Sequence, residues 1–100
     1  MNKKSVIEAL VEALEEEFKG ESTGHDWFHI ERVWRNARLI AKKEDCDTYI
    51  VELGALLHDI ADHKFVENAD KVALSRTHEL LSNFGVDSKT ILDVQHIVLN

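Results

Sequence analysis

Residues 50–61 read IVELGALLHDIA, the most apolar stretch of the chain. Apolar residues occupy more than one side of a helical wheel here, which is typical of a helix buried on most sides. The pattern predicts a central helix over 48–63, and Asp47 is a suitable N-cap for it. The pair His58-Asp59 interrupts the apolar run, and burying an ionised carboxylate is costly unless a partner or a metal ion compensates its charge.

Four further helices are predicted around this one. Their expected ranges are 6–19, 26–43, 69–84 and from 87 or 88 to the end. The chain contains no proline and only four glycines, which favours helices over strands. Ser5 and Glu8 have the spacing of a capping box for the first helix, and Gly85 is placed to end the fourth. The sequence therefore predicts an all-α fold, in a single domain over residues 1–100 with no internal boundary.

The composition is acidic, with a formal net charge of −7 at pH 7. An acidic chain repels nucleic-acid phosphates unless a basic patch offsets the repulsion, and the only basic doublets, Lys3-Lys4 and Lys42-Lys43, are each followed by acidic residues. No nucleic-acid polymer is therefore expected as a partner. Cys46 is the single cysteine, so no intramolecular disulfide is expected. No stretch is apolar and long enough for a signal peptide or a membrane span, and the chain is expected to be soluble and cytoplasmic, without a membrane partner.

A second histidine-bearing segment precedes the first by about thirty residues. Residues 25–33 read HDWFHIERV, and His29 lies one turn before Val33 on the predicted helix 26–43. His29 can therefore project toward the interior beside the apolar stripe of that helix. Together with the His-Asp pair it would give three metal ligands on two packed helices, with positions left open for water and substrate. The apolar stripe is expected at Ile30, Val33, Ala37 and Ile40.

Both segments resemble motifs of the HD superfamily of metal-dependent phosphohydrolases. Residues 24–33 (GHDWFHIERV) look like the GHDxxHxxRV opening of one bacterial branch, and residues 57–62 (LHDIAD) look like its LHDIAD segment. Either motif alone is weak, whereas the two in this order and at this spacing are fairly specific. The resemblance covers about residue 22 to the end. It implies a helical HD-domain bundle, of which about five helices are present, and a divalent metal ion (Mn, Fe, Zn, Ni or Mg) bound by His29, His58 and Asp59.

The resemblance also implies a reaction. A bound metal ion lowers the pKa of its water toward neutrality. The implied function is thus a phosphohydrolase that uses metal-activated water on a small phosphorylated substrate, either a phosphomonoester or a nucleotide-type phosphoanhydride. Asp62 lies one turn after His58 and is the expected general acid/base or water-orienting group. Arg32 and Lys64 are candidates for contacts with phosphate oxygens, and His25 is a candidate for a further substrate contact.

Several of these residues have structural alternatives. The His58-Asp59 pair can form hydrogen bonds with its neighbours in the core without a metal ion. Asp62 can cap or pair locally, Arg32 can form an ion pair with a neighbouring carboxylate, Lys64 can be a solvated surface lysine, and His25 can be a polar turn residue. A zinc peptidase is excluded, because the spacing from residue 58 to 62 lacks the second histidine of H-E-x-x-H.

The family's fourth metal ligand, an aspartate on a later helix, is expected beyond residue 100. Asp87 and Asp93 qualify by residue type only, and Asp87 fits better as a helix cap. The sequence therefore predicts that the chain is the N-terminal part of a longer HD domain, truncated before the later helices. The alternative function is a non-catalytic helical interaction or regulatory module with an incomplete metal site. In that case exposed Ile91, Val94 and Val98 would drive association into a homo-oligomer.

Overall fold

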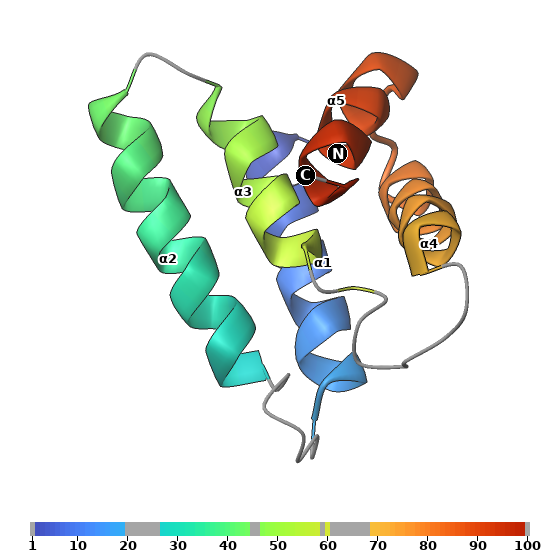
Figure 1. Ribbon diagram of the computed structural model, residues 1–100, viewed down its shortest axis with the longest axis horizontal. Coiled ribbons are helices and arrows are strands. Elements are labelled where there is room, and N and C mark those ends of the chain that lie inside the picture. The colour runs from blue at the N-terminus through green and yellow to red at the C-terminus, as the bar shows by residue number, and fades with distance from the viewer. Residues whose placement is uncertain (1, 20–26, 45–46, 59, 61–68, 100) are drawn as a thin grey trace.

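The described part of the protein is mostly helical. The computed structural model describes residues 2–19, 27–44, 47–58, 60 and 69–99. The helices within these ranges are α1 (Lys3–Glu17), α2 (Trp27–Lys43), α3 (Thr48–Leu57), α4 (Ala69–Asn83) and α5 (Ser88–Leu99). Figure 1 shows their arrangement. The predicted all-α fold is confirmed.

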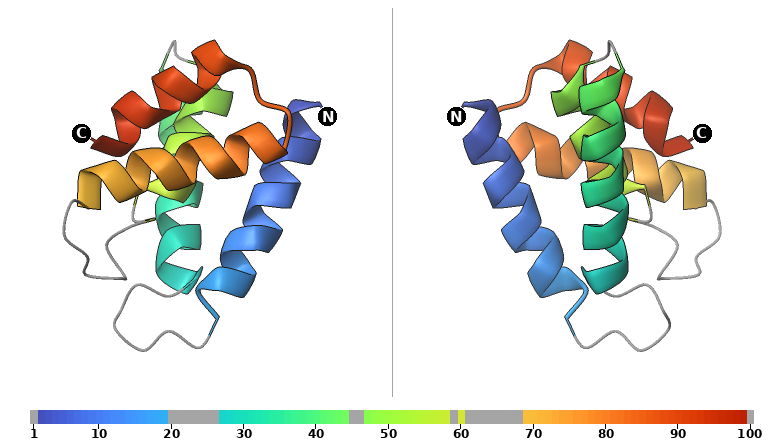
Figure 2. Two further views of the ribbon diagram at one scale, coloured as in Figure 1. Left: turned by 90° about the vertical axis from the view of Figure 1, so that its right-hand side faces the viewer. Right: turned by 90° about the vertical axis from the view of Figure 1, so that its left-hand side faces the viewer.

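Helix α3 lies at the centre of the arrangement. It runs antiparallel to α2, and it packs against α5 on its other side and against α1 behind it in the view of Figure 1. Helix α4 reaches the rest of the molecule mainly through α5, to which it is inclined in the side views of Figure 2. The last five residues of α3, 53–57, are all buried. A helix that is apolar on most sides therefore takes the position in which most sides are covered, as the sequence predicted.

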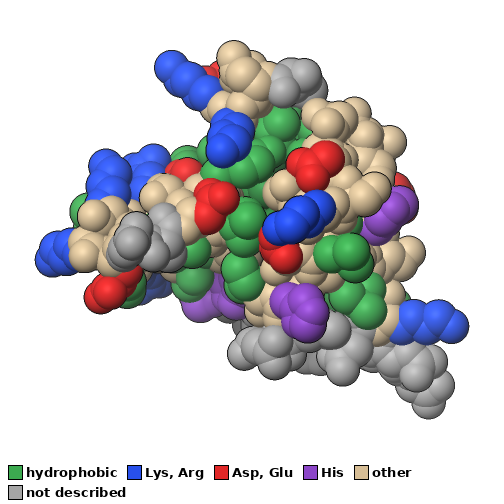
Figure 3. Space-filling model, turned by 90° about the horizontal axis from the view of Figure 1, so that it is seen from above, with side chains coloured by type: hydrophobic (Ala, Val, Ile, Leu, Met, Phe, Trp, Pro, Cys, Tyr) green, Lys and Arg blue, Asp and Glu red, His purple; other side chains and the backbone are tan. Residues whose placement is uncertain are grey.

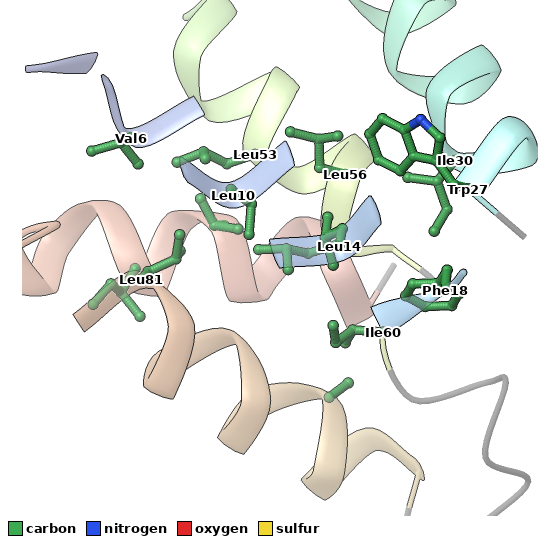
Figure 4. Close-up of a cluster of buried hydrophobic side chains, with 14 residues drawn as sticks. Val6, Leu10, Leu14, Phe18, Trp27, Ile30, Leu53, Leu56, Ile60 and Leu81 are labelled. Carbon is green, nitrogen blue, oxygen red and sulfur yellow. The ribbon is translucent and has the colours of Figure 1, made fainter. Parts of the chain in front are cut away.

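A hydrophobic core connects the described helices around α3. Leu10 and Leu14 of α1 meet Leu53 and Leu56 of α3 at its middle, and Leu81 brings α4 into contact with the same cluster (Figure 4). Each fully buried leucine contributes roughly 1.5–3 kcal/mol relative to an exposed one, so these contacts dominate the stability of the fold. The buried hydrophobic residues of this cluster are Val6, Leu10, Leu14, Phe18, Trp27, Ile30, Leu53, Leu56, Leu57, Ile60, Ala73, Leu81, Ile91 and Val94.

The N-cap of α1 differs from the prediction. Asn2 is the cap, and its Oδ1 accepts a hydrogen bond from the backbone N–H of Ser5 at 2.8 Å. The prediction that Ser5 caps this helix was wrong, because Asn2 has the extended backbone of a cap and supplies its side-chain oxygen one turn earlier. Asp47 caps α3 as predicted, since its Oδ1 accepts from the backbone N–H groups of Tyr49 and Ile50.

The turn between α4 and α5 follows the sequence signals. Gly85 has a φ of 78°, a left-handed conformation that glycine adopts without steric cost, and it follows the end of α4. Asp87 caps α5 by accepting hydrogen bonds from the hydroxyl of Thr90 at 2.7 Å and from its backbone N–H at 3.2 Å. These bonds, led by the one from the hydroxyl, favour the ionised carboxylate and lower the pKa of Asp87.

The exposure of three apolar residues differs from the sequence-based interpretation. Ile40 is 61% exposed, and the neighbouring Ala41 takes the buried position near the end of α2. Ile91 and Val94, which the alternative function requires on the surface, are buried, while Val98 is half-buried. The reason is that α5 packs against both α3 and α4, so two of its sides are covered. Of the three residues named for self-association, Val98 alone therefore keeps part of its surface exposed.

Helices α3 and α5 approach each other closely at Gly54. A Cβ atom at this position would lie 2.5 Å from Cγ2 of Ile97 and 3.0 Å from its Cβ. Both atoms are near the backbone of α5, so a larger residue would have to move that helix. Gly54 thus sets the distance between α3 and α5. Among the residues that the structure describes, no helix has the length and apolar character needed to cross a membrane.

Candidate metal centre

Helix α3 ends at Leu57, just before His58. The predicted helix end at residue 63 was wrong: α3 stops at Leu57, His58 is its C-cap, and the backbone N–H of Ile60 donates to the carbonyl of Leu57 at 3.1 Å in a tighter turn. Ile60 remains buried in the core after this turn. The histidine therefore lies at the end of the buried helix, where a side chain can reach both the core and the surface.

The imidazole of His58 is oriented by its own helix. It is half-buried, and its Nδ1 lies 2.7 Å from the carbonyl oxygen of Ala55. A carbonyl only accepts hydrogen bonds, so Nδ1 is the donor, and the neutral ring carries its lone pair on Nε2. Metal-binding histidines commonly have such a second bond, which fixes the tautomer and the direction of the ring.

His29 lies beside His58 at the start of α2. It is half-buried, and the centroids of the two rings are 5.9 Å apart, with the ring planes inclined at 48°. The structure thus brings together the two histidines that the sequence proposed as ligands from separate segments. Residues 29 and 58 are 29 positions apart in the chain, and only the antiparallel packing of α2 on α3 makes them neighbours.

The register of the two helices explains this contact. The indole N–H of Trp34 on α2 donates to Oε1 of Glu52 on α3 at 3.0 Å. His29 lies five residues before Trp34 on α2. Leu57, the neighbour of His58, lies five residues after Glu52 on α3. Because both helices rise by about 1.5 Å per residue, the same pairing places His29 level with the end of α3.

The separation of the two imidazoles is close to the one that a shared metal ion requires. A metal–nitrogen bond of about 2.0–2.1 Å places the ion roughly 3 Å from each ring centre, so two rings on one ion lie at most about 6 Å apart. The separation of 5.9 Å is near this limit, which corresponds to an ion on the line between the two rings. A tetrahedral ion holds two ring centres roughly 5 Å apart, so the rings would have to move about 1 Å closer to share one. Two histidines are only part of a donor set, since a catalytic ion takes about three protein ligands. Within the described ranges, no group of three His, Cys, Asp or Glu side chains is placed to hold an ion.

Of the other predicted site residues, the structure describes Arg32. Arg32 is exposed on α2, three residues after His29 and hence on a neighbouring part of the same helix surface. Its neighbour Glu31 is 3.6 Å from Arg35, one turn further on. Four proposed residues lie outside the described part of the chain: Asp59, Asp62, Lys64 and His25.

The two aspartates considered for the fourth ligand have other roles. Asp87 caps α5 through Thr90. Asp93 lies within 3.4 Å of Lys89 on the outer part of α5. Both contacts are within one turn of the same helix, which fits the expectation that neither residue is the fourth ligand.

A groove beside His58 was missed by sequence reasoning. It has a volume of about 450 Å³, and apart from His58 its described lining is apolar or glycine. Val33 and Ala37 of α2 form one wall, and Ile97 and Val98 of α5 form the opposite one. The hydrophobic periodicity of each helix was visible in the sequence, but the space between the helices depends on how they pack.

A polar cluster at the other end of the α2–α3 pair was also missed. Glu52 accepts from Trp34 and lies 4.0 Å from Nη1 of Arg38, whose guanidinium is 5.0 Å from the centre of the Trp34 ring. Nothing in the sequence links these residues, because the link depends on the helix register.

Comparisons with known proteins agree with the motif positions. The family model described as "HD domain" matches residues 27–100, a range that contains both histidines. Over 78 residues the chain is 40% identical to "Uncharacterized protein YpgQ" of Bacillus subtilis (strain 168). The aligned region covers 78% of this chain and 38% of that protein. The chain therefore spans less than half the length of this curated relative. No solved structure matches the chain.

Proposed function

Since the chain belongs to the HD-domain family, whose superfamily is one of metal-dependent phosphohydrolases, we propose that it contributes a divalent metal centre to such an enzyme. The proposed substrate is a small phosphorylated molecule, either a phosphomonoester or a nucleotide-type phosphoanhydride. The observation that carries the proposal is the pair of imidazoles from α2 and α3 with centroids 5.9 Å apart. The acidic composition and the single cysteine support a cytoplasmic location for this enzyme.

The residues have separate proposed roles. His29 and His58 bind the ion, with Asp59 as the third ligand. The hydrogen bond from Nδ1 of His58 to Ala55 holds the ring so that Nε2 is the coordinating atom. When bound, the ion would supply Lewis-acid polarisation of the phosphoryl group and lower the pKa of a water molecule.

The remaining roles concern the substrate and the proton. Asp62 is proposed to orient water and to exchange its proton. The exposed guanidinium of Arg32 can bind two phosphate oxygens at once, because its N–H groups form a planar fork. Lys64 and His25 are proposed as further contacts to the substrate. These contacts would offset the charge of a phosphate that the acidic chain otherwise repels.

Metal binding by single-histidine variants tests the proposal. The 100-residue chain is stripped with a chelator, and binding of Mn²⁺ and Ni²⁺ is measured by calorimetry and by the shift in Tm. His58→Ala and His29→Ala are expected to weaken binding by on the order of 100-fold or more, since even supporting residues of metal sites are worth 10- to 100-fold. Phosphate release from 4-nitrophenyl phosphate and from nucleoside triphosphates is then assayed with the bound metal.

The matched control is His78→Ala. His78 is exposed on α4, outside the described contact between α2 and α3, so its removal should leave the metal affinity unchanged. Equal metal affinity in the His58→Ala variant and the parent chain would contradict the proposed centre.

A further inference from the structure

A second groove lies at the opposite end of the α2–α3 pair from the two histidines. It has a volume of about 460 Å³ and is formed by the start of α1, the middle of α2 and the start of α3. Small-molecule sites in proteins typically have volumes of about 300–1,000 Å³. Trp34, the lining residue of α2 nearest to His29, is five residues from it, or about 7.5 Å at the helical rise, and the described lining includes neither histidine. The groove is therefore separate from the proposed metal centre.

The walls of this groove are aromatic and aliphatic. Trp34 of α2, Tyr49 of α3 and Ile7 of α1 line it, and all three side chains are half-buried against the core. The hydrogen bond from Trp34 to Glu52 fixes the indole ring at a depth where part of its surface remains open. Aromatic side chains held in this way offer flat apolar surfaces at a low cost in conformational entropy.

The charges of the groove oppose those of the whole chain. Its lining includes the cations Lys3, Lys4 and Arg38 and the carboxylates Glu8 and Glu52. Three cations against two carboxylates leave a net charge of +1, whereas the chain carries −7. Figure 3 looks down on this end, and Lys and Arg side chains at the start of α1 and along α2 flank a band of hydrophobic side chains.

The cations are placed above the aromatic walls. The ammonium of Lys3 is 5.3 Å from the centre of the Tyr49 ring, and the guanidinium of Arg38 is 5.0 Å from that of Trp34. Cation–π contacts at exposed sites are weak, and a guanidinium has five N–H donors. Nη1 of Arg38 also lies 4.0 Å from Oε1 of Glu52. That contact uses only part of the guanidinium, so both cations lie at the groove with donors that can bind an anion.

From this arrangement we propose that the groove binds a small organic anion with a flat aromatic body. The ring system lies against Trp34, Tyr49 and Ile7, and the anionic group lies among Lys3, Lys4 and Arg38. Charge complementarity selects an anion over a neutral molecule, and the aromatic walls select a ring over an inorganic ion. This binding does not depend on the metal centre.

The test uses naphthalene-2-sulfonate as the probe and the 100-residue chain labelled with ¹⁵N, in buffer with a chelator. The indole N–H resonance of Trp34 reports on the groove, and that of the buried Trp27 is an internal control. The probe is expected to shift the Trp34 resonance and to bind about tenfold more tightly than either naphthalene-2-methanol or methanesulfonate, since each lacks one of the two recognised features. Equal affinity for the neutral alcohol would overturn the proposal.

Charge variants on the groove test the role of the cations. Lys4→Gln and Arg38→Gln should each weaken binding of the probe by about threefold, and Glu8→Gln should strengthen it by about twofold, as expected for single solvent-screened charges. Lys4 and Glu8 are exposed, so these two changes keep the fold intact.

The controls are chosen from the same helices. Arg35→Gln on α2 and Glu12→Gln on α1 alter exposed charges that do not line the groove. Both should leave the dissociation constant unchanged. The proposal is overturned if these variants change the affinity as much as Arg38→Gln and Glu8→Gln do, because the effect would then come from net charge alone.

Discussion

The two ends of the α2–α3 pair use polar residues in different ways. At one end, Trp34, Arg38 and Glu52 are complementary: a donor and a cation meet a carboxylate. At the other end, two imidazoles of the same kind come together, with centroids 5.9 Å apart. The two contacts are separated by about five residues on each helix.

This difference separates a cluster whose opposite charges are paired within the protein from a pair of like groups. The first cluster combines opposite charges within the protein, so it stabilises the helix register without any added ligand. Two imidazoles placed side by side are like groups, and both supply lone pairs in their neutral form. A cation between them would use both lone pairs. The polar contact at one end adds to the core packing that holds α2 on α3.

The largest effect is expected from a residue between the two ends. Leu53 has no exposed surface and lies in the core beneath both. Leu53→Ala should lower the free energy of unfolding by about 2–5 kcal/mol, because it removes buried methyl groups and leaves a cavity. Urea denaturation followed by circular dichroism measures this loss.

Leu39→Ala provides the matched control for that experiment. Leu39 is 58% exposed on α2, and its truncation should change stability by no more than about 0.5 kcal/mol. Similar losses for the two leucines would show that Leu53 does not connect the ends through a packed core.

A smaller loss of stability is expected when the hydrogen bond between Trp34 and Glu52 is removed. Glu52→Ala removes the acceptor of the Trp34 indole N–H in a half-buried place and should lower the free energy of unfolding by about 1–3 kcal/mol. Glu52→Gln keeps a side-chain acceptor and should cost less. Thermal denaturation of both variants is the measurement.

The Glu52 variants also show how strongly the two ends are coupled. The metal affinity of the folded Glu52→Ala chain should stay within about twofold of the parent, because the core still holds α2 on α3. A loss of metal affinity as large as that of His58→Ala would mean that the Trp34–Glu52 bond alone sets the position of the histidines.

The smallest effect concerns the single tyrosine at the groove end. Burial raises the pKa of the Tyr49 hydroxyl above 10, and the nearby charges of Asp87 and Asp47 raise it further. Asp87→Asn should lower that pKa toward its ordinary value, while asparagine remains a good N-cap for α5. Absorbance of the phenolate during an alkaline titration follows this group directly, since Tyr49 is the only tyrosine. An unchanged midpoint would contradict a contribution from Asp87.

Much of the fold could be read from local sequence signals. Hydrophobic periodicity predicted the helices, and the short-range chemistry of Asp47, Gly85 and Asp87 marked three of their ends. The end of α3 could not be read in this way, because apolar residues continue past Leu57 and Ile60 is buried from a turn. Burial of Ile91 and Val94 also escaped prediction, since an amphipathic pattern does not say how many neighbours a helix has.

The sequence by itself determined the all-α class, the motif residues and the membership of the HD-domain family, because these depend on residue identity and spacing along the chain. The tertiary structure decided which residues from different helices meet. The contact of His29 with His58, the link from Trp34 to Glu52 and the two grooves all depend on the antiparallel register of α2 and α3 and on how closely the helices pack. That register results from the packing of many side chains at once, and no single segment encodes it.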